Sequence, residues 1–341
     1  MTMSVSASPA TGDSHEDSSP TLGLEDMLFS GKDIWSQNDP FFYFGADNFL
    51  PVSVYEALRR EFPGPEHFTI RQLEGKCRVD HQDTSSILAE RPTWRRFVEL
   101  LREKAFIDSV FDFALPGLRQ ARGLAGLKRW RLCDENTEDP GWGLFERPVV
   151  LGYEFSRYPR GAILTPHTDK ESKMIIMLLY FPDPQWRPEY GGGTDIYAPK
   201  DSSKNKNWMN RHLEHDQVET LCSVPFTPNT LAGFVKSRDS WHGVSNVNCP
   251  PEMGRNSFII NYLIPSRVMS RLHSRAISSF RRRTEARFFR DVPDLMERDK
   301  TFFRTRVGEM AKAGHSDGEI AKELGLPPGS VEKYRAQSQK D

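Results

Sequence analysis

The chain has 341 residues, and its 46 lysines and arginines nearly balance 47 aspartates and glutamates, for a formal net charge of −1. This length can bury a large hydrophobic core, as one large domain or as one domain with an appendage. The balanced charge argues against a general polyanion binder. The four cysteines show no Cys-x-x-Cys spacing, which argues against a disulfide framework or a zinc site and fits a reducing compartment.

The sequence carries no targeting or membrane-spanning pattern. No apolar run approaches the roughly 18 residues that a transmembrane helix needs. The N-terminus is acidic and rich in serine, unlike a secretory signal. We therefore expect a cytoplasmic protein without a membrane partner. Residues 1–22 are small and polar, and they cannot bury enough apolar surface to offset the entropy of ordering, so we predict a disordered tail.

The segment from about residue 23 to 125 is predicted to be mainly helical. It opens with a short strand at 41–44, followed by a helix in which Val54, Leu58 and Phe62 recur at helical spacing. Residues 93–115 form a second amphipathic stretch. Its apolar stripe consists of Trp94, Phe97, Leu100, Leu101 and Phe106. We expect both helices to brace a sheet.

The segment from about residue 126 to 265 is predicted to be rich in strands. The expected strands are 149–159, 162–169, 174–181, 194–199, 229–236, 241–247 and 256–264. The run 174–181 is continuously apolar, which is typical of a strand buried on both faces. Many short strands separated by Gly/Pro turns favour a closed, mainly β architecture with flanking helices over a doubly wound sheet.

One long polar segment interrupts the strands. Residues 200–220 contain many helix and strand breakers, and loops of this length in compact domains are often functional lids or simple insertions. Trp208 and the pair His212 and His215 lie in it. Direct contact with a substrate and a solvated insertion are both open interpretations.

The most informative stretch is 158–180, which contains His167 and Asp169 just ahead of the apolar run. On a β-strand, residues i and i+2 point to the same face, so the imidazole and the carboxylate would converge. His242 supplies a third ligand. Two histidines and one carboxylate form the facial triad of non-heme Fe(II) oxygenases. A lone His-x-Asp pair is common by chance, and a lone histidine is more often a packed core residue. Arg255 lies thirteen residues after His242.

The ordered set of motifs resembles a known enzyme family. The set comprises Y-x-x-G-x-x-L-x-x-H-x-D at 158–169, GGGTDIY at 191–197, His242, and Arg-Asn-Ser at 255–257. It resembles the 2-oxoglutarate- and Fe(II)-dependent oxygenase superfamily, and within it the prolyl 4-hydroxylase-like branch. The resemblance spans about residues 39–265. It implies a double-stranded β-helix core, a jelly roll of the cupin type, with helices packed outside.

The resemblance also implies a set of ligands. Fe(II) would be held by His167, Asp169 and His242, 2-oxoglutarate would chelate the iron, and O₂ would be the oxidant. Ascorbate is compatible as a supporting reductant. The carboxylate at position 169 points to hydroxylation, because halogenating relatives have a small residue there.

The far carboxylate of 2-oxoglutarate needs a cation. Arg255 offers a planar, always charged, bidentate partner, and Ser257 on the same strand face adds a hydroxyl. Tyr180 matches a tyrosine that contacts 2-oxoglutarate in prolyl hydroxylases, and Tyr158 could play a similar part. As alternatives, Arg255 could pair with a surface carboxylate, and Tyr180 could be a core aromatic residue.

The expected reaction is hydroxylation with release of succinate and CO₂. A small-molecule substrate, such as an amino acid or a natural-product intermediate, is favoured over a peptidyl proline. The 200–220 insertion and an arginine where several prolyl hydroxylases use lysine both argue against a peptidyl substrate, although a protein substrate stays open. The sequence does not indicate an oligomeric state.

Residues 266–341 form a basic, helix-prone extension with consecutive arginines at 281–283. Its end, about 300–341, resembles the helix-turn-helix of LuxR-type and sigma-factor-type DNA-binding domains, on the pattern E-I-A-x-x-L-G-L-x-x-x-x-V-x-x-x-R. A small three-helix cap or dimerisation unit is favoured over DNA binding. The main alternative to the enzyme is therefore a DNA-binding regulator whose barrel senses metal or 2-oxoglutarate without turnover.

Overall fold

The structure is a computed structural model. It describes residues 22–71, 75–123, 129–135, 137, 146–207, 210–272, 287–289, 292, 295–324, 326 and 328–338. Residues 1–21 of the predicted disordered tail and the arginine run at 281–283 lie outside these residues. Leu22, the last residue of the predicted tail, is buried in the core, so the tail prediction is wrong at this position. None of the described helices is long and apolar enough to cross a bilayer.

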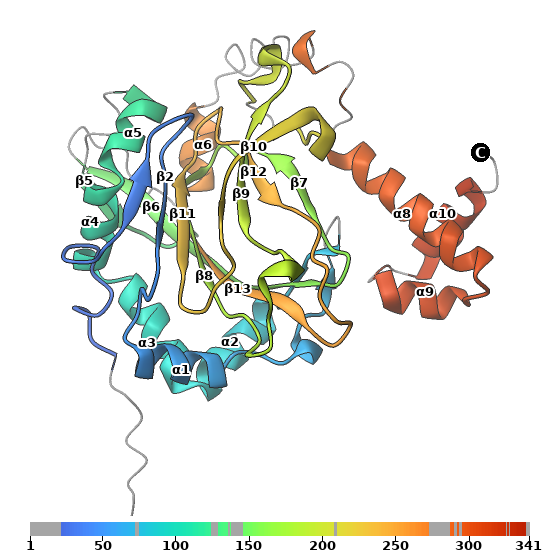
Figure 1. Cartoon of the computed structure of the whole chain (residues 1–341), viewed down its shortest axis with the longest axis horizontal. Coiled ribbons are helices and arrows are strands. Elements are labelled where there is room, and N and C mark those ends of the chain that lie inside the picture. Colours follow the sequence, from blue (N-terminus) through green and yellow to red (C-terminus); the bar gives the residue numbers. More distant parts are fainter. Residues whose placement is uncertain are drawn as a thin grey trace, which may run out of the picture.

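The core consists of two β-sheets (Figure 1). The large sheet has the order β1 (Trp35–Gln37), β2 (Tyr43–Ala46), β11 (Leu231–Val235), β8 (Lys173–Tyr180), β13 (Gly254–Leu263), β6 (Glu146–Pro159), β4 (Cys77–Arg78) and β3 (Ile70–Arg71). β5 (Arg129–Leu132) pairs with β6 in parallel, whereas the other pairs are antiparallel. The small sheet has the order β10 (Val218–Val224), β9 (Thr194–Pro199), β12 (His242–Val244) and β7 (Leu164–His167). The predicted mainly β core of the double-stranded β-helix type is confirmed.

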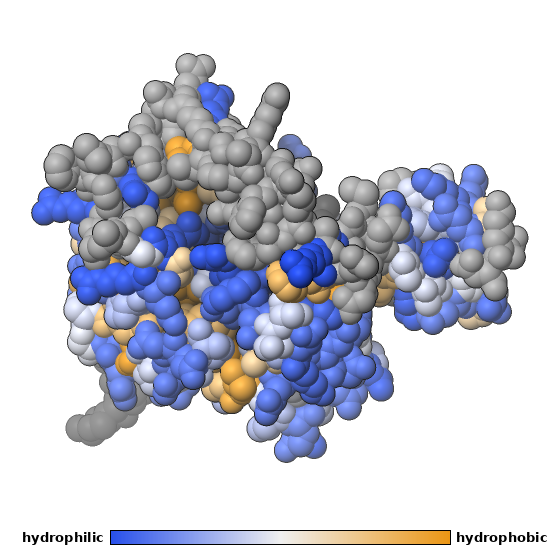
Figure 2. Space-filling view, turned by 90° about the horizontal axis from the view of Figure 1, so that it is seen from above, coloured by the Kyte–Doolittle hydropathy of each residue, from blue (hydrophilic) through white to orange (hydrophobic). Residues whose placement is uncertain are grey.

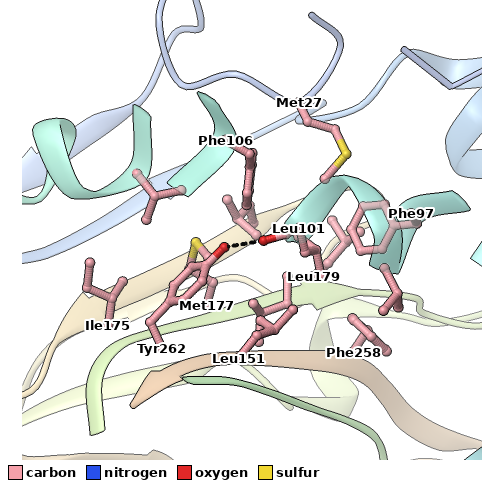
Figure 3. Close-up of a cluster of buried hydrophobic side chains, with 14 of the residues drawn as sticks. Met27, Phe97, Leu101, Phe106, Leu151, Ile175, Met177, Leu179, Phe258 and Tyr262 are labelled. Atoms are coloured by element: carbon pink, nitrogen blue, oxygen red, sulfur yellow. Dashed lines mark hydrogen bonds between the residues drawn. The ribbon is translucent and has the colours of Figure 1, made fainter. Parts of the chain in front are cut away.

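The apolar strand β8 explains how the two layers meet. Ile176 and Leu178 point into the space between the sheets, while Ile175, Met177 and Leu179 point the other way, into the core beneath the helices (Figure 3). This alternation follows from the period of two along a strand. The prediction that this strand is buried on both faces is confirmed.

Helices cover the outer face of the large sheet (Figure 1). They are α1 (Val52–Arg60), α2 (His81–Glu90), α3 (Pro92–Leu101), α4 (Lys104–Phe113), α5 (Leu115–Arg122) and α6 (Ser266–Leu272). The stripe predicted over 93–115 is buried in this core. The single helix predicted there is wrong, because the chain breaks at Arg102–Glu103, where Glu103 is extended (ψ 134°). Tyr262 on β13 donates a 2.7 Å hydrogen bond to the carbonyl of Leu101, the last residue of α3 (Figure 3).

The segment 200–220 is a loop for most of its length. It contains two short 3₁₀ turns, Ser202–Lys204 and His215–Gln217. Its last three residues belong to β10, a strand that the sequence analysis missed. β10 alternates poorly, with four exposed positions in seven, because it is the edge strand of the small sheet.

Three C-terminal helices gather beside the β-rich body (right of Figure 1). They are α8 (Leu295–Lys312), α9 (Asp317–Leu324) and α10 (Pro328–Ser338). A small apolar core holds them together, built from Val307, Ile320, Ala321, Leu324 and Val331. On the face seen in Figure 2, the coloured surface is largely hydrophilic with scattered apolar areas.

Candidate functional site

Two neighbouring strands of the small sheet bring the histidines together. β7 and β12 pair antiparallel, and His242 lies directly opposite His167 in the register. The ring centroids are 4.3 Å apart, and each residue is only 6% exposed. Residues 75 positions apart in the sequence are therefore held on rigid backbone, as a preorganised site requires.

Both imidazoles are oriented by the backbone. Nδ1 of His167 donates to the carbonyl of Thr165, and Nδ1 of His242 donates to that of Ser240, each at 2.9 Å. Because a carbonyl only accepts, the proton of each neutral ring is on Nδ1 and the Nε2 lone pair is free to bind a metal. The two Nε2 atoms lie 3.6 and 3.5 Å from the carboxylate oxygens of Asp169.

Asp169 reaches this position in a way that the sequence analysis did not predict. We expected His167 and Asp169 on one face of a continuous strand. β7 instead ends at His167, and Asp169 adopts a left-handed backbone conformation with φ 68°. Aspartate tolerates this region better than most residues, and the turn brings its carboxylate back toward the rings. Strained backbone of this kind clusters at functional sites.

The charges around the carboxylate keep it ionised. Burial alone would raise the pKa of Asp169, but Lys173 and the two histidines together hold it well below its usual range. Lys173 Nζ contacts Asp169 Oδ1 at 2.8 Å. Burial, reinforced by His167, lowers the pKa of His242 to about 3, so that this imidazole is neutral at physiological pH. One carboxylate and two imidazoles, their ligand atoms within 4.8 Å of one another, could thus hold a divalent metal.

The three residues open into a cavity of about 590 Å³ between the two sheets, which is within the usual range for small-molecule sites. Its apolar lining includes Ile176, Leu178, Phe234 and Ile259. Arg255 lies in the same cavity and is completely buried.

Arg255 is held by neutral groups. Its Nε donates to the carbonyl of Gly192, and its two terminal nitrogens donate to Ser257 Oγ (3.3 Å) and Thr194 Oγ1 (3.2 Å). The guanidinium lies 5.1–5.3 Å from three aromatic ring centres, those of Tyr158, Tyr180 and Phe226. Within the described part of the chain, it forms no ion pair with a carboxylate. A buried charge without a counter-ion is costly, so the arrangement fits an incoming anion.

The turn at 191–193 carries the carbonyl that Arg255 uses. Gly192 has φ +86°, and a Cβ there would lie 3.2 Å from the Trp186 ring and 3.4 Å from Arg255 Cδ. Only glycine meets both demands, a left-handed backbone and close approach of a large side chain.

Comparison with known proteins assigns this part of the chain. Residues 153–263 match the family model described as 2OG-Fe(II) oxygenase superfamily. The matched segment runs from β6 to β13 and contains the triad, the glycine turn and Arg255. This segment is therefore similar to the core of 2OG-Fe(II) oxygenases. No curated protein matches the chain.

Several solved structures are similar to this chain at low sequence identity. They include a prolyl-4-hydroxylase from Pseudomonas putida (18% identity, 67% of this chain and 95% of that chain, TM-score 0.32). A prolyl hydroxylase from Trichoplax adhaerens is 12% identical (70% and 90%, TM-score 0.39). HygX from Streptomyces hygroscopicus, with nickel and 2-oxoglutarate bound, is also 12% identical (67% and 85%, TM-score 0.38).

The donor set of the oxygenase core fits its metal and cosubstrate. Two neutral imidazoles and one carboxylate suit Fe(II) and leave the remaining coordination positions open. Arg255 lines the same cavity and has no carboxylate partner among the described residues, so it suits the far carboxylate of a dicarboxylate bound at the metal. Fe(II), 2-oxoglutarate and O₂ are the metal, cosubstrate and oxidant of this class of enzyme.

The remaining predicted cosubstrate residues take different places. Tyr158 lines the cavity. Tyr180 is completely buried, and its hydroxyl lies 2.5 Å from Thr194 Oγ1, so its contacts support Arg255. Ser257 accepts from Arg255. Thr194, which lines the cavity and also accepts from Arg255, was missed. Its position directly after the three glycines was the signal that could have identified it.

The loop at residues 200–217, which is the 200–220 segment without its last three residues in β10, contributes one histidine to the site. His212 lines the cavity, and its ring stacks on that of His167 (centroids 4.7 Å apart, planes 10° apart). His212 Nδ1 lies 2.9 Å from Thr165 Oγ1. His215 instead contacts the ring of Tyr197. Trp208 lies outside the described residues.

Proposed function

We propose that the protein is an Fe(II)- and 2-oxoglutarate-dependent hydroxylase that acts on a small molecule. His167, Asp169 and His242 would bind the iron, and Arg255 would bind the far carboxylate of 2-oxoglutarate. One observation carries the proposal: the two Nε2 atoms and one buried carboxylate lie together as three ligand atoms around one position. The same cavity holds Arg255, which has no carboxylate partner among the described residues.

Each of these side chains has a distinct task. Thr165 and Ser240 fix the ring tautomers through their carbonyls, so the ligand lone pairs need no reorganisation on binding metal. Lys173 keeps Asp169 ionised and oriented. When bound, Fe(II) with 2-oxoglutarate and O₂ supplies an oxidant that can remove hydrogen from a substrate C–H bond, while the apolar wall excludes water around it.

Arg255 would orient the cosubstrate. Its guanidinium matches a carboxylate with two parallel hydrogen bonds. Gly192, Thr194 and Ser257 fix its rotamer, and the aromatic rings around it lower the local dielectric. Tyr158 lies beside the guanidinium on the cavity wall and would contact the cosubstrate, whereas Tyr180 would act through Arg255.

A small substrate is favoured by the way the cavity is enclosed. Besides the two sheets, the lining includes Asn210 and His212 from the 200–217 loop and Phe303 from α8. These segments restrict the approach of a long polypeptide. A peptidyl substrate, such as a prolyl side chain, remains the second candidate.

We assign residues 23–265 to the oxygenase domain and 266–341 to a helical extension with a structural or partner-binding role. We favour this role over DNA binding by α9 and α10, the two helices that resemble a helix-turn-helix. Arg335 on α10 contacts Asp317 at 2.5 Å and the carbonyl of His315 at 3.2 Å, so this basic side chain is engaged within the helical unit. The four free thiols fit a reducing cytoplasm.

The proposal is tested by turnover of 2-oxoglutarate. Purified protein with Fe(II), O₂ and 2-oxoglutarate should release succinate slowly even without substrate. Asp169→Ala should abolish this release, and Glu219→Gln, an exposed change on β10, should leave it unchanged. Well-folded protein that binds Fe(II) but releases no succinate under any condition would favour a sensor without turnover.

A further inference from the structure

The cavity continues beyond the metal centre into a second, polar region. Alternate residues of β13 face it: Arg255 at the inner end, then Ile259, Asn261 and Leu263 toward the outside. Asn261 is the polar member of this outer row, between the apolar Ile259 and Leu263. We call the region formed by Glu154, Asn210 and Asn261, together with the nearby lysines, the polar subsite.

The two carboxamides have unused hydrogen-bonding capacity. Asn261 and Asn210 both line the cavity, and the Oδ1 atom of each is buried without a partner among the described residues. A buried acceptor left without a donor costs roughly 1–3 kcal/mol. The two groups come from separate elements, a core strand and the 200–217 loop. The wall of one cavity thus contains two acceptors that the described residues leave unsatisfied, and a ligand that brings N–H or O–H donors would satisfy them.

A carboxylate lies on the same wall. Glu154 on β6 is opposite Ile259 in the register with β13, so it flanks the row that contains Asn261. Lys76 donates to Oε1 of Glu154, and the Glu154 side chain is 25% exposed. Burial alone would raise the pKa of Glu154, but Lys76, Lys173 and Arg78 together lower it, which keeps the group negative.

Positive charge lies on the other side of the same row. Lys173 on β8 is opposite Leu263 in the register with β13, and Lys170 also lines the cavity. Because adjacent strands lie roughly 4.8 Å apart, the backbones of β6 and β8 are separated by roughly 10 Å across β13. An acidic group and basic groups thus lie on opposite sides of a carboxamide, at a spacing suited to a small molecule with both charges.

We propose that the polar subsite binds the ammonium and carboxylate groups of a free amino acid and directs its side chain toward the metal centre. The inference rests on the proposed function and narrows its substrate class. The ammonium group would donate to Glu154 and the carboxamide oxygens, and the carboxylate would accept from Lys170 and Lys173. A blocked or peptide-bonded amino acid lacks one or both charges, so it would lose the contacts to Glu154 and the carboxamide oxygens, the contacts to the two lysines, or both.

The test uses the full chain with Fe(II), 2-oxoglutarate and O₂, and measures succinate release with each of the twenty proteinogenic amino acids. We expect at least one free amino acid to raise the rate about tenfold or more above the unstimulated rate. Its N-acetyl and carboxamide derivatives should raise it far less. An equal response to the blocked derivatives would overturn the zwitterion assignment.

Two variants then address the subsite directly. Glu154→Gln should raise KM for the stimulating amino acid by about 10- to 100-fold, the usual effect of losing a charge-assisted hydrogen bond. Asn261→Leu should raise it by about 3- to 10-fold. Both variants should keep the wild-type KM for 2-oxoglutarate, and Glu219→Gln should match the wild type in every parameter. Unchanged KM for the amino acid in both variants would refute the assignment.

The experiments distinguish an error in the polar-subsite inference from an error in the proposed function. Protein that consumes 2-oxoglutarate normally but responds to none of the amino acids would contradict the polar subsite alone. Protein that neither binds 2-oxoglutarate with Fe(II) nor releases succinate would contradict both. The Asn261→Leu variant keeps the inference testable even if removing the Lys76 partner in Glu154→Gln lowers stability.

Discussion

The inner and outer ends of the cavity differ in how completely their polar groups are satisfied. At the inner end, Arg255 is completely buried and makes three hydrogen bonds to Gly192, Thr194 and Ser257. At the outer end, Asn210 and Asn261 each keep a buried oxygen without a partner among the described residues. Both ends belong to one cavity and share strand β13.

The difference reflects what each end has to bind. A cosubstrate that is the same in every turnover can be met by a side chain whose geometry is fixed in advance, which lowers the entropy cost of binding. A substrate must enter and leave, and its own donors complete the outer groups. The inner end is therefore expected to control Fe(II) and 2-oxoglutarate, and the outer end to control substrate choice.

The largest effect should come from the metal ligand that the turn positions. Asp169→Ala removes the only carboxylate of the triad, and we expect succinate release to fall at least about 1,000-fold. The free energy of unfolding of the metal-free protein should change much less, because the lost group is a site residue. Metal analysis of the purified variant, beside unfolding in urea, separates these effects. Full iron occupancy in the variant would contradict the assigned role.

The next effect should come from Arg255. Arg255→Lys keeps the charge but loses the planar pair of donors, so we expect KM for 2-oxoglutarate to rise by about 10- to 100-fold with little change in Fe(II) affinity. Steady-state kinetics at varied 2-oxoglutarate provide the measurement. A change in KM for the primary substrate alone would assign Arg255 to substrate binding, the role expected of the outer end of the cavity.

Lys173 tests whether support of the carboxylate matters. Lys173→Met keeps the length of the side chain and removes the contact with Asp169 Oδ1. Loss of such a supporting partner typically costs about 10- to 100-fold in metal affinity or activity, and we expect the lower part of this range for Fe(II). Competition with a chelator gives the affinity. Wild-type affinity in this variant would show that the histidines alone orient Asp169.

His212 lies at the boundary of the two ends. His212→Phe preserves an aromatic ring stacked on His167 but removes the nitrogen near Thr165 Oγ1. We expect Fe(II) affinity to change less than about threefold, and KM for the stimulating substrate to change more than that. A larger loss of iron than of substrate affinity would assign His212 to the inner end.

The smallest effect concerns stability. Burial lowers the pKa of Lys236 to about 7, against a weaker opposing effect of Asp169. The unfolded chain, with an ordinary lysine pKa near 10.4, then binds more protons between about pH 7 and 10. Stability should therefore rise with pH in this window, by at most about 1.4 kcal/mol per pH unit from this group. Lys236→Met should remove that contribution. Urea unfolding between pH 7 and 10 measures the free energy of unfolding, and an equal dependence on pH in the wild type and the variant would contradict the prediction.

The sequence allowed the prediction of most of the fold, because the buried strands carry apolar residues on each face that packs against a core. The run 174–181, for instance, has one apolar face for each of the two cores. The break between α3 and α4 was missed because no proline or glycine marks it. Strand β10 was missed because an edge strand has little buried surface to leave a hydrophobic pattern.

The candidate site was predictable in part. His167, Asp169 and His242 could be named from spacing, but the left-handed turn at Asp169 could not, since it depends on the packing around it. Asn261 could have been found by counting alternate residues from Arg255 along one strand. The Lys76–Glu154 pair could not, because those residues are 78 positions apart and their contact depends on the pairing of β4 with β6.

The most direct test is an anaerobic absorption titration of the metal-free protein with Fe(II) and 2-oxoglutarate. The wild type should develop the visible charge-transfer band of iron-bound 2-oxoglutarate at one equivalent of each. Asp169→Ala should lose the band, Arg255→Ala should need far more 2-oxoglutarate to reach it, and Asn261→Leu should match the wild type. Absence of the band in well-folded wild-type protein would contradict the oxygenase assignment and direct attention to the C-terminal helices.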